Sequence, residues 1–156
     1  MRHVAGRALW LGNPGDTHDP KTILDAGIEA VVELADNEPL AILPRELVRC
    51  RFPLSDGGEN PAWMLRLASE SVAAFLRAKV PVLVCCSGGM NRSVCIAAAG
   101  VALADGCPLR EALLGIVQCG PADVSPRLLA QLQKALVDEQ CDSQKGSVQF
   151  TAKPTV

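Results

Sequence analysis

The feature that most constrains the fold is an unbroken apolar run at residues 81–86 (Pro-Val-Leu-Val-Cys-Cys), which leads into a loop with two glycines. A strand with one solvated face alternates apolar and polar residues, so a continuous run predicts a strand covered on both faces. The following segment, residues 93–103, is apolar on every side, which predicts a buried helix that ends at Gly106. A doubly covered strand joined to a buried helix is typical of an α/β domain.

The rest of the chain fits this class. Further strands are predicted at residues 8–11, 28–34 and 47–52, and further helices at residues 21–26, 108–118 and 126–136, and from Pro61 with Asn60 as its N-cap. We therefore expect a small, mostly parallel sheet of four to five strands flanked by helices. One domain should span residues 1–139, and a flexible tail should follow at residues 140–156, where the helical periodicity is lost.

Composition excludes several classes of function. The chain has 15 basic and 17 acidic residues and a net charge of −2, which argues against a general binder of nucleic acid or membrane surfaces. Seven cysteines with no C-x-x-C pair favour neither a disulfide framework nor a zinc site. The apolar run before Gly12 is too short for a signal peptide, and no stretch is long enough to span a membrane. A cytoplasmic protein is expected.

The chemistry is predicted in the loop Cys-Ser-Gly-Gly-Met-Asn-Arg-Ser, residues 86–93. A glycine loop between a strand and a helix directs backbone N–H groups and the positive end of the helix dipole at one point, which suits a phosphate. The same field favours the thiolate of Cys86, and Arg92 can bind two phosphate oxygens at once. The alternative is a structural cysteine beside a surface arginine. The expected phosphate-binding residues are Ser87, Gly88, Gly89, Met90, Asn91 and Arg92.

These residues resemble the His-Cys-x5-Arg-Ser/Thr signature of the protein tyrosine phosphatase superfamily, and specifically its compact dual-specificity branch. The resemblance covers most of residues 8–137. It implies a general acid on a separate loop, and Asp56 stands thirty residues before Cys86 in a glycine-rich loop after a strand. Glu59 is the second candidate for the acid. Asp56 could instead be a turn-forming aspartate before glycines.

The resemblance implies a phosphomonoester hydrolase that works through a phosphocysteine intermediate. Cys86 would be the nucleophile, Arg92 the phosphate clamp, Asp56 the acid and then the base, and Ser93 the hydroxyl that hydrogen-bonds the sulfur. Ser93 could also be only a helix-start residue. No metal or other cofactor is expected, because Arg92 and the loop amides supply the positive field. The substrate would be a phosphorylated protein, at tyrosine, serine or threonine, or a small phosphorylated molecule.

Two departures from the family pattern bear on function. Cys85 stands where the family has histidine, which puts the acidity of Cys86 in question; Cys85 itself is either a core residue or a regulatory disulfide partner. The chain has no tyrosine, so Trp63 is the candidate aromatic residue at the rim, unless it packs in the core.

Two other functions fit the same loop. A catalytically weak pseudophosphatase would keep the phosphate cradle and bind oxyanions without hydrolysis. A sulfur-transfer or arsenate-reducing enzyme could use a similar cysteine loop, but it would not need Asp56.

Overall fold

The computed structural model describes residues 1–142, and its centre is a five-stranded sheet with the order β1-β2-β5-β3-β4. The strands are β1 (Arg2–His3), β2 (Leu9–Gly12), β3 (Ala30–Ala35), β4 (Val48–Leu54) and β5 (Val82–Cys85). β5 lies between β2 and β3 and is parallel to both, β4 is parallel to β3, and the short β1 is antiparallel to β2. The predicted α/β class with a mostly parallel sheet is confirmed.

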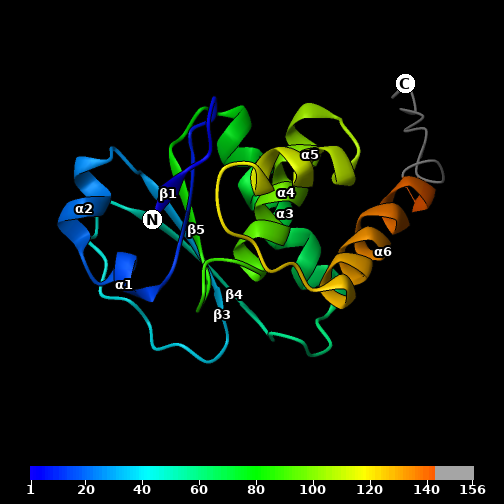
Figure 1. Cartoon of the computed structure of the whole chain (residues 1–156), viewed down its shortest axis with the longest axis horizontal. Helices are drawn as coiled ribbons and strands as arrows, with labels where there is room; N and C mark the ends of the chain where they lie inside the picture. Colours follow the sequence, from blue (N-terminus) through cyan, green and yellow to red (C-terminus); the bar gives the residue numbers. More distant parts are fainter. Residues whose placement is uncertain (143–156) are drawn as a thin grey trace, which may run out of the picture.

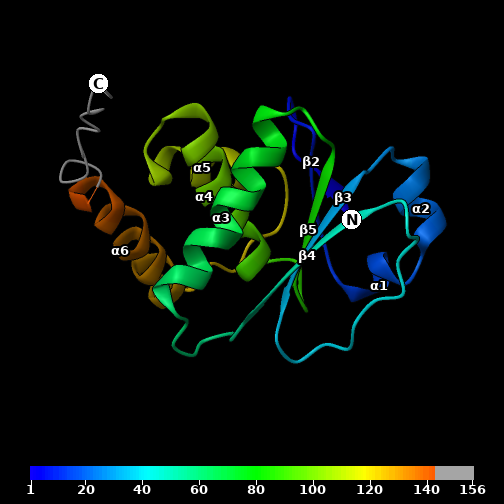
Figure 2. The same ribbon diagram turned by 180° about the vertical axis from the view of Figure 1, so that it is seen from behind.

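Helices cover both faces of the sheet (Figures 1 and 2). α1 (Pro14–Thr17) and α2 (Pro20–Asp25) lie on one face, and α3 (Ala62–Arg77), α4 (Arg92–Asp105), α5 (Leu109–Val117) and α6 (Pro126–Asp142) lie on the other. β5 contributes Val82 and Val84 to the larger core and Leu83 and Cys85 to the smaller one. The unbroken apolar run at residues 81–86 therefore reflects a strand buried on both faces, as predicted.

α4 is the central helix of the larger core, and its residues 92–102 are all buried. It packs so closely on α3 that a Cβ at Gly100 would lie 2.5 Å from Val72 Cγ1. The helix ends at Gly106, whose φ of 68° is the left-handed conformation that a C-terminal glycine allows. Both the buried helix and its end match the prediction.

Two local predictions were wrong, and one short helix was not predicted. α3 begins at Ala62 with no side-chain cap, because Asn60 instead closes the preceding loop by accepting a hydrogen bond from Ser55 N at 2.8 Å. The turn after β2 contains the short helix α1, which Asn13 and Asp16 cap. α6 extends through Asp142, beyond the predicted helix end; the remaining residues of the predicted tail, 143–156, lie outside the described part of the chain.

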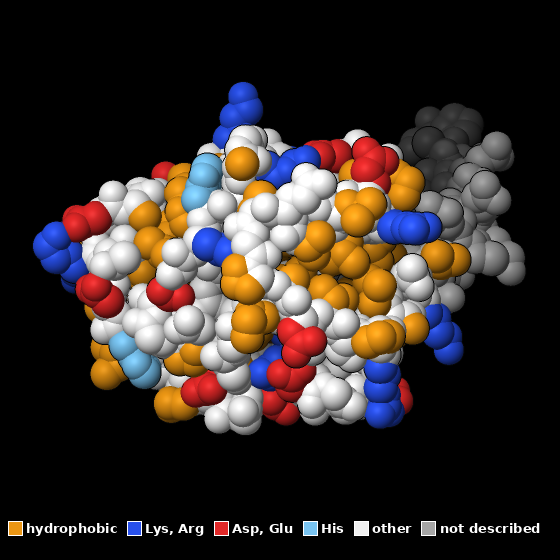
Figure 3. All heavy atoms as spheres, viewed as in Figure 1, with side chains coloured by type: hydrophobic (Ala, Val, Ile, Leu, Met, Phe, Trp, Pro, Cys, Tyr) orange, Lys and Arg blue, Asp and Glu red, His pale blue; other side chains and the backbone are white. Residues whose placement is uncertain are grey.

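The surface in Figure 3 carries acidic and basic side chains interspersed, without a continuous basic area on that face. Within residues 1–142, no helix combines the length and the apolar character that crossing a bilayer requires. Apolar side chains are visible over the region of α5 and α6, where a groove is lined by Leu109, Leu136 and Val137, among others.

Candidate active site

The loop of residues 86–91 joins the carboxyl end of β5 to the first residue of α4, Arg92. The loops that follow β3, β4 and β5 come together along the lower side of the molecule in Figure 1, the edge where parallel sheets bind ligands. Gly89 has a φ of 67°, and a Cβ there would lie 2.9 Å from the carbonyl oxygen of Gly12. A side chain at this position would therefore push the loop off β2 and open its curvature.

Cys86 lies at the base of this loop and is 3 % exposed. Its Sγ is 3.4 Å from Ser93 Oγ and 3.5 Å from Ser93 N. Burial opposes ionisation, but hydrogen bonds from the Ser93 hydroxyl and from the backbone of Ser93 and Gly89, together with the charge of Arg92, lower the pKa of the Cys86 thiol. The loop thus favours the thiolate without a histidine at position 85.

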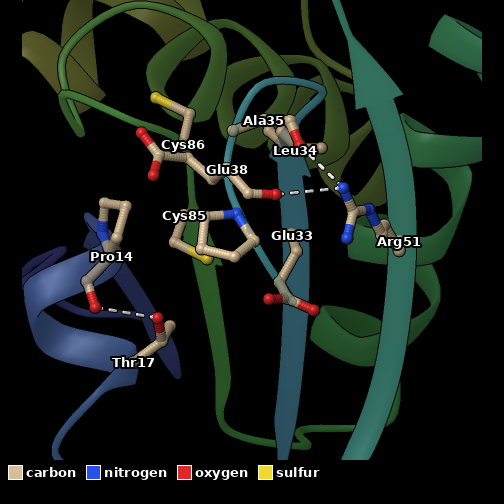
Figure 4. A pocket seen from close by; sticks show the side chains of 10 residues that line it. Pro14, Thr17, Glu33, Leu34, Ala35, Glu38, Arg51, Cys85 and Cys86 are labelled. Carbon is tan, nitrogen blue, oxygen red and sulfur yellow. Dashed lines mark hydrogen bonds between the residues drawn. The ribbon is translucent and has the colours of Figure 1, made fainter. Parts of the chain in front are cut away.

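Cys85 occupies the opposite face of β5. Figure 4 shows the sulfur atoms of Cys85 and Cys86 pointing in different directions, and Cys85 Sγ lies 3.6 Å from the carbonyl oxygen of Val32. Burial, followed by the nearby Glu33 carboxylate, raises the pKa of Cys85, so it remains a neutral thiol. The pocket beside it in Figure 4 has a cavity volume of about 20 Å³, enough for one water. This geometry favours the core role for Cys85 over a disulfide partner of Cys86.

Arg92 is 1 % exposed and is held in place by hydrogen bonds. Its Nη1 donates to the Leu54 carbonyl at 2.8 Å and to Asp36 Oδ1 at 3.2 Å, and its Nη2 donates to Ser87 Oγ at 2.9 Å. Its Nε is buried and has no hydrogen-bond partner among the described residues. A buried guanidinium N–H without a partner is costly, and an oxyanion in the loop would satisfy it.

Asp56 lies in the loop between β4 and α3, next to the cysteine loop. Its Oδ2 is 3.3 Å from Arg92 Nη2, and its Oδ1 accepts a hydrogen bond from Asn91 Nδ2 at 2.7 Å. Glu59 pairs instead with Arg127 on α6 and is 79 % exposed, so Asp56 is the better placed of the two candidate acids.

Trp63 is 58 % exposed on the first turn of α3, which contradicts the interpretation that it packs in the core.

Two site residues were missed from the sequence. Asp36 and Asn37 follow β3 directly; Asp36 contacts Arg92, and Asn37 Oδ1 accepts a hydrogen bond from Ser87 Oγ at 3.0 Å. The rule that ligands bind beyond the carboxyl ends of parallel strands could have identified them, because β3 neighbours β5.

Comparisons by sequence give no matching family model and no matching curated protein. Solved structures do match. Human DUSP28 aligns with a TM-score of 0.78 and 24 % identity over 91 % of this chain and 99 % of its own. A mouse protein described as a dual specificity phosphatase, complexed with zinc tungstate, aligns with a TM-score of 0.77 and 26 % identity over 91 % of this chain and 89 % of its own.

A third structure is the human tyrosine phosphatase-like serine/threonine/tyrosine-interacting protein, with a TM-score of 0.73 and 19 % identity over 90 % of this chain and 97 % of its own. All three comparisons span nearly the whole described domain. The chain has the fold of the protein tyrosine phosphatase superfamily in its compact dual-specificity form, as the sequence resemblance predicted.

Proposed function

We propose that the chain is a phosphomonoester hydrolase that forms a phosphocysteine intermediate on Cys86. The observation that carries this proposal is that one short loop joins Cys86, whose Sγ contacts the Ser93 hydroxyl and amide, to the buried guanidinium of Arg92, whose Nε has no partner within residues 1–142. A tetrahedral dianion placed there would meet the loop amides and this N–H of Arg92. The fold neighbours, which include phosphatases, support the same class of activity.

In the first step the Cys86 thiolate attacks phosphorus, and an S–P bond forms as the P–O bond to the leaving group breaks. The electron pair of that bond stays on the leaving oxygen, which takes the proton of the Asp56 carboxyl group. Arg92 and the loop amides hold the three remaining phosphoryl oxygens, where charge is spread in the transition state.

In the second step a water molecule attacks phosphorus and gives a proton to the Asp56 carboxylate. The S–P bond breaks, its electron pair returns to Cys86 as thiolate, and inorganic phosphate leaves. The Ser93 hydroxyl stabilises that thiolate and makes the sulfur a better leaving group. Asp56 thus ends the cycle protonated, ready for the next substrate.

The substrate class follows from the same surroundings. The carboxylates of Asp36 and Asp56 lie against Arg92, and the sequence between Cys86 and Arg92 contains no lysine or further arginine, which disfavours polyphosphorylated molecules. We therefore infer a single phosphoryl group on a protein side chain or on a small molecule. The natural substrate would therefore be a phosphomonoester that carries one phosphoryl group.

The test uses p-nitrophenyl phosphate with the wild type, Cys86→Ser and Cys85→Ser. Cys85, the last residue of β5, and Cys86, which follows it, belong to different core clusters and form a matched pair. Cys86→Ser should therefore abolish hydrolysis, while Cys85→Ser should retain it. Tungstate should still raise the melting temperature of Cys86→Ser, because the amides and Arg92 remain.

The competing functions give different results in this assay. A pseudophosphatase would bind tungstate in every variant and hydrolyse nothing, even as wild type. A sulfur-transfer or arsenate-reducing enzyme would not need Asp56, so a fourth variant, Asp56→Asn, would be as active as the wild type. Hydrolysis that survives in Cys86→Ser would contradict the proposal itself.

A further inference from the structure

The side chain of Asn91 joins three segments that are far apart in the sequence. Its Oδ1 accepts a hydrogen bond from Ser125 N at 2.9 Å, and its Nδ2 donates to Asp56 Oδ1 at 2.7 Å. Asn91 belongs to the cysteine loop, Asp56 to the loop after β4, and Ser125 immediately precedes α6. The amide group therefore lies between the two loops on which the proposed chemistry depends.

The orientation of this amide is determined by its partners. The backbone N–H of Ser125 can only donate, so it requires the oxygen end of the Asn91 amide. The nitrogen end must then face Asp56, and an NH₂ group can only donate. Asn91 thus presents a fixed donor, and not an acceptor, to the carboxyl group of Asp56.

A fixed donor on one carboxyl oxygen distinguishes the two oxygens of Asp56. Oδ1 is occupied as an acceptor by Asn91, while Oδ2 is 3.3 Å from Arg92 Nη2 on the side of the phosphate cradle. Among the described residues, Oδ1 receives a hydrogen bond from Asn91, whereas Oδ2 has only the ion-pair contact with Arg92 and accepts no hydrogen bond. In the acid form Oδ1 would therefore be the carbonyl-type acceptor and Oδ2 would carry the proton, on the side of Arg92.

The remaining contacts of this loop are made further along it. Gln131 on α6 donates to the carbonyl of Gly58 at 3.0 Å and accepts from Asn60 N at 3.2 Å, and Arg127 donates to the carbonyl of Gly57 at 3.1 Å. These bonds hold the loop backbone on α6. They leave the torsion angles of the Asp56 side chain to Asn91 and Arg92.

We propose that Asn91 is a positioning residue, which orients the Asp56 carboxyl group so that Oδ2 delivers its proton to the leaving oxygen. This inference rests on the proposed hydrolase function and adds to it a role for the side chain of Asn91, a residue whose expected contribution to phosphate binding is its backbone. The alternative is a purely structural role, in which Asn91 only fixes the shape of the loop through Ser125.

Two variants separate these roles. Asn91→Asp is isosteric and keeps an oxygen for Ser125 N, but at neutral pH it places a second carboxylate against Asp56 and removes the donor. Asn91→Ala removes both contacts. If Asn91 serves Asp56, both variants should slow hydrolysis of phenyl phosphate by about 10- to 100-fold in kcat/KM, which reports the first step, because misplacement of a catalytic group by about 1 Å costs this much. If only the Ser125 contact matters, Asn91→Asp should behave as wild type, which would overturn the proposal.

A substrate that needs no proton provides the second readout. With 2,4-dinitrophenyl phosphate, whose leaving group departs without protonation, kcat/KM of Asn91→Ala should stay within about threefold of wild type. Inhibition of this uncharged variant by inorganic phosphate should also be unchanged, since the backbone cradle and Arg92 remain. Equal losses for both substrates, or weakened phosphate inhibition, would mean that Asn91 shapes the loop and does not act through Asp56.

A double-mutant cycle with Asp56→Asn completes the test. Asp56→Asn alone should slow phenyl phosphate hydrolysis by about 10²–10⁴-fold, and adding Asn91→Ala should cost nothing further. An additional loss in the double variant would refute positioning through Asp56. If Asp56→Asn is as fast as wild type, Asp56 is not the general acid and Asn91 has no acid to position. Failure of the hydrolase proposal itself would look different, because the wild type would then be inactive on both substrates.

Discussion

Replacing Arg92 with lysine tests how the phosphoryl group is held. The change keeps the positive charge but removes the planar fork, in which Nε has no partner among the described residues and Nη2 lies 2.9 Å from Ser87 Oγ. A hydrogen bond to a charged group contributes about 1.5–3 kcal/mol, so losing two of them costs about 3–6 kcal/mol. That corresponds to a fall of roughly 10²–10⁴ in kcat/KM. The lysine would also leave the Leu54 carbonyl, now 2.8 Å from Nη1, without its donor.

The assay is kcat/KM for p-nitrophenyl phosphate in Arg92→Lys, Arg92→Ala and a matched control, Arg77→Lys. Arg77 donates to the Leu103 carbonyl on the exposed side of α3, away from the site, so its replacement should leave turnover unchanged. Melting temperatures with and without tungstate would show that each variant is folded. The lysine variant should be nearly as impaired as the alanine variant. An Arg92→Lys enzyme within about threefold of wild type would refute the fork and leave only a requirement for charge.

Three further predictions concern the loop and the helix beneath it. Ser93→Ala removes a hydrogen bond that lowers the pKa of Cys86, so the thiolate should form only at higher pH; the acid limb of kcat/KM and the pH dependence of iodoacetate alkylation should both move upward, and an unmoved limb would exclude this role. Gly89→Ala should abolish tungstate-induced stabilisation as well as turnover, since its Cβ would lie 2.9 Å from a backbone oxygen; a variant that still binds tungstate tightly would contradict the loop geometry. Gly100→Ala should lower the free energy of unfolding by about 1–3 kcal/mol in urea titrations, because its Cβ would overlap Val72. The control Gly115→Ala, on α5 with open space around it, should raise the free energy of unfolding, and equal effects of the two changes would be inconsistent with the close contact of α3 and α4.

Much of the fold could be predicted because the residues that form it act locally. Each of the correct predictions depends on the residues of a single helix or strand. Examples are the apolar run that ends at Cys86, the apolar helix after it, and Gly106 at the end of that helix. The wrong predictions involve residues whose partners are distant or ambiguous. Asn60 precedes a proline and a helix, which predicts a cap, but its side chain closes the loop onto Ser55 instead.

The residues of the candidate site also fall into those that sequence spacing could predict and those that only the folded structure brings together. Cys86, Arg92 and Asp56 could be proposed because a fixed spacing relates them, and the structure brings Arg92 and Asp56 within 3.3 Å. Asp36 contacts Arg92 from the loop after β3, 56 positions earlier in the sequence, and no fixed spacing relates the two residues. The acidity of Cys86 was questioned because of Cys85, yet it depends on Ser93, Gly89 and Arg92, whose geometry only the folded loop reveals.

The central claim, a covalent phosphocysteine on Cys86, can be measured directly. The wild-type enzyme is mixed with p-nitrophenyl phosphate, quenched within the first turnover, digested, and examined by mass spectrometry for the peptide that contains Cys85 and Cys86. We expect one added phosphoryl group, located on Cys86, in the wild type and in Cys85→Ser, and none in Cys86→Ser. Steady turnover without a phosphoryl group on this peptide, or a phosphoryl group that persists in Cys86→Ser, would contradict the proposed mechanism.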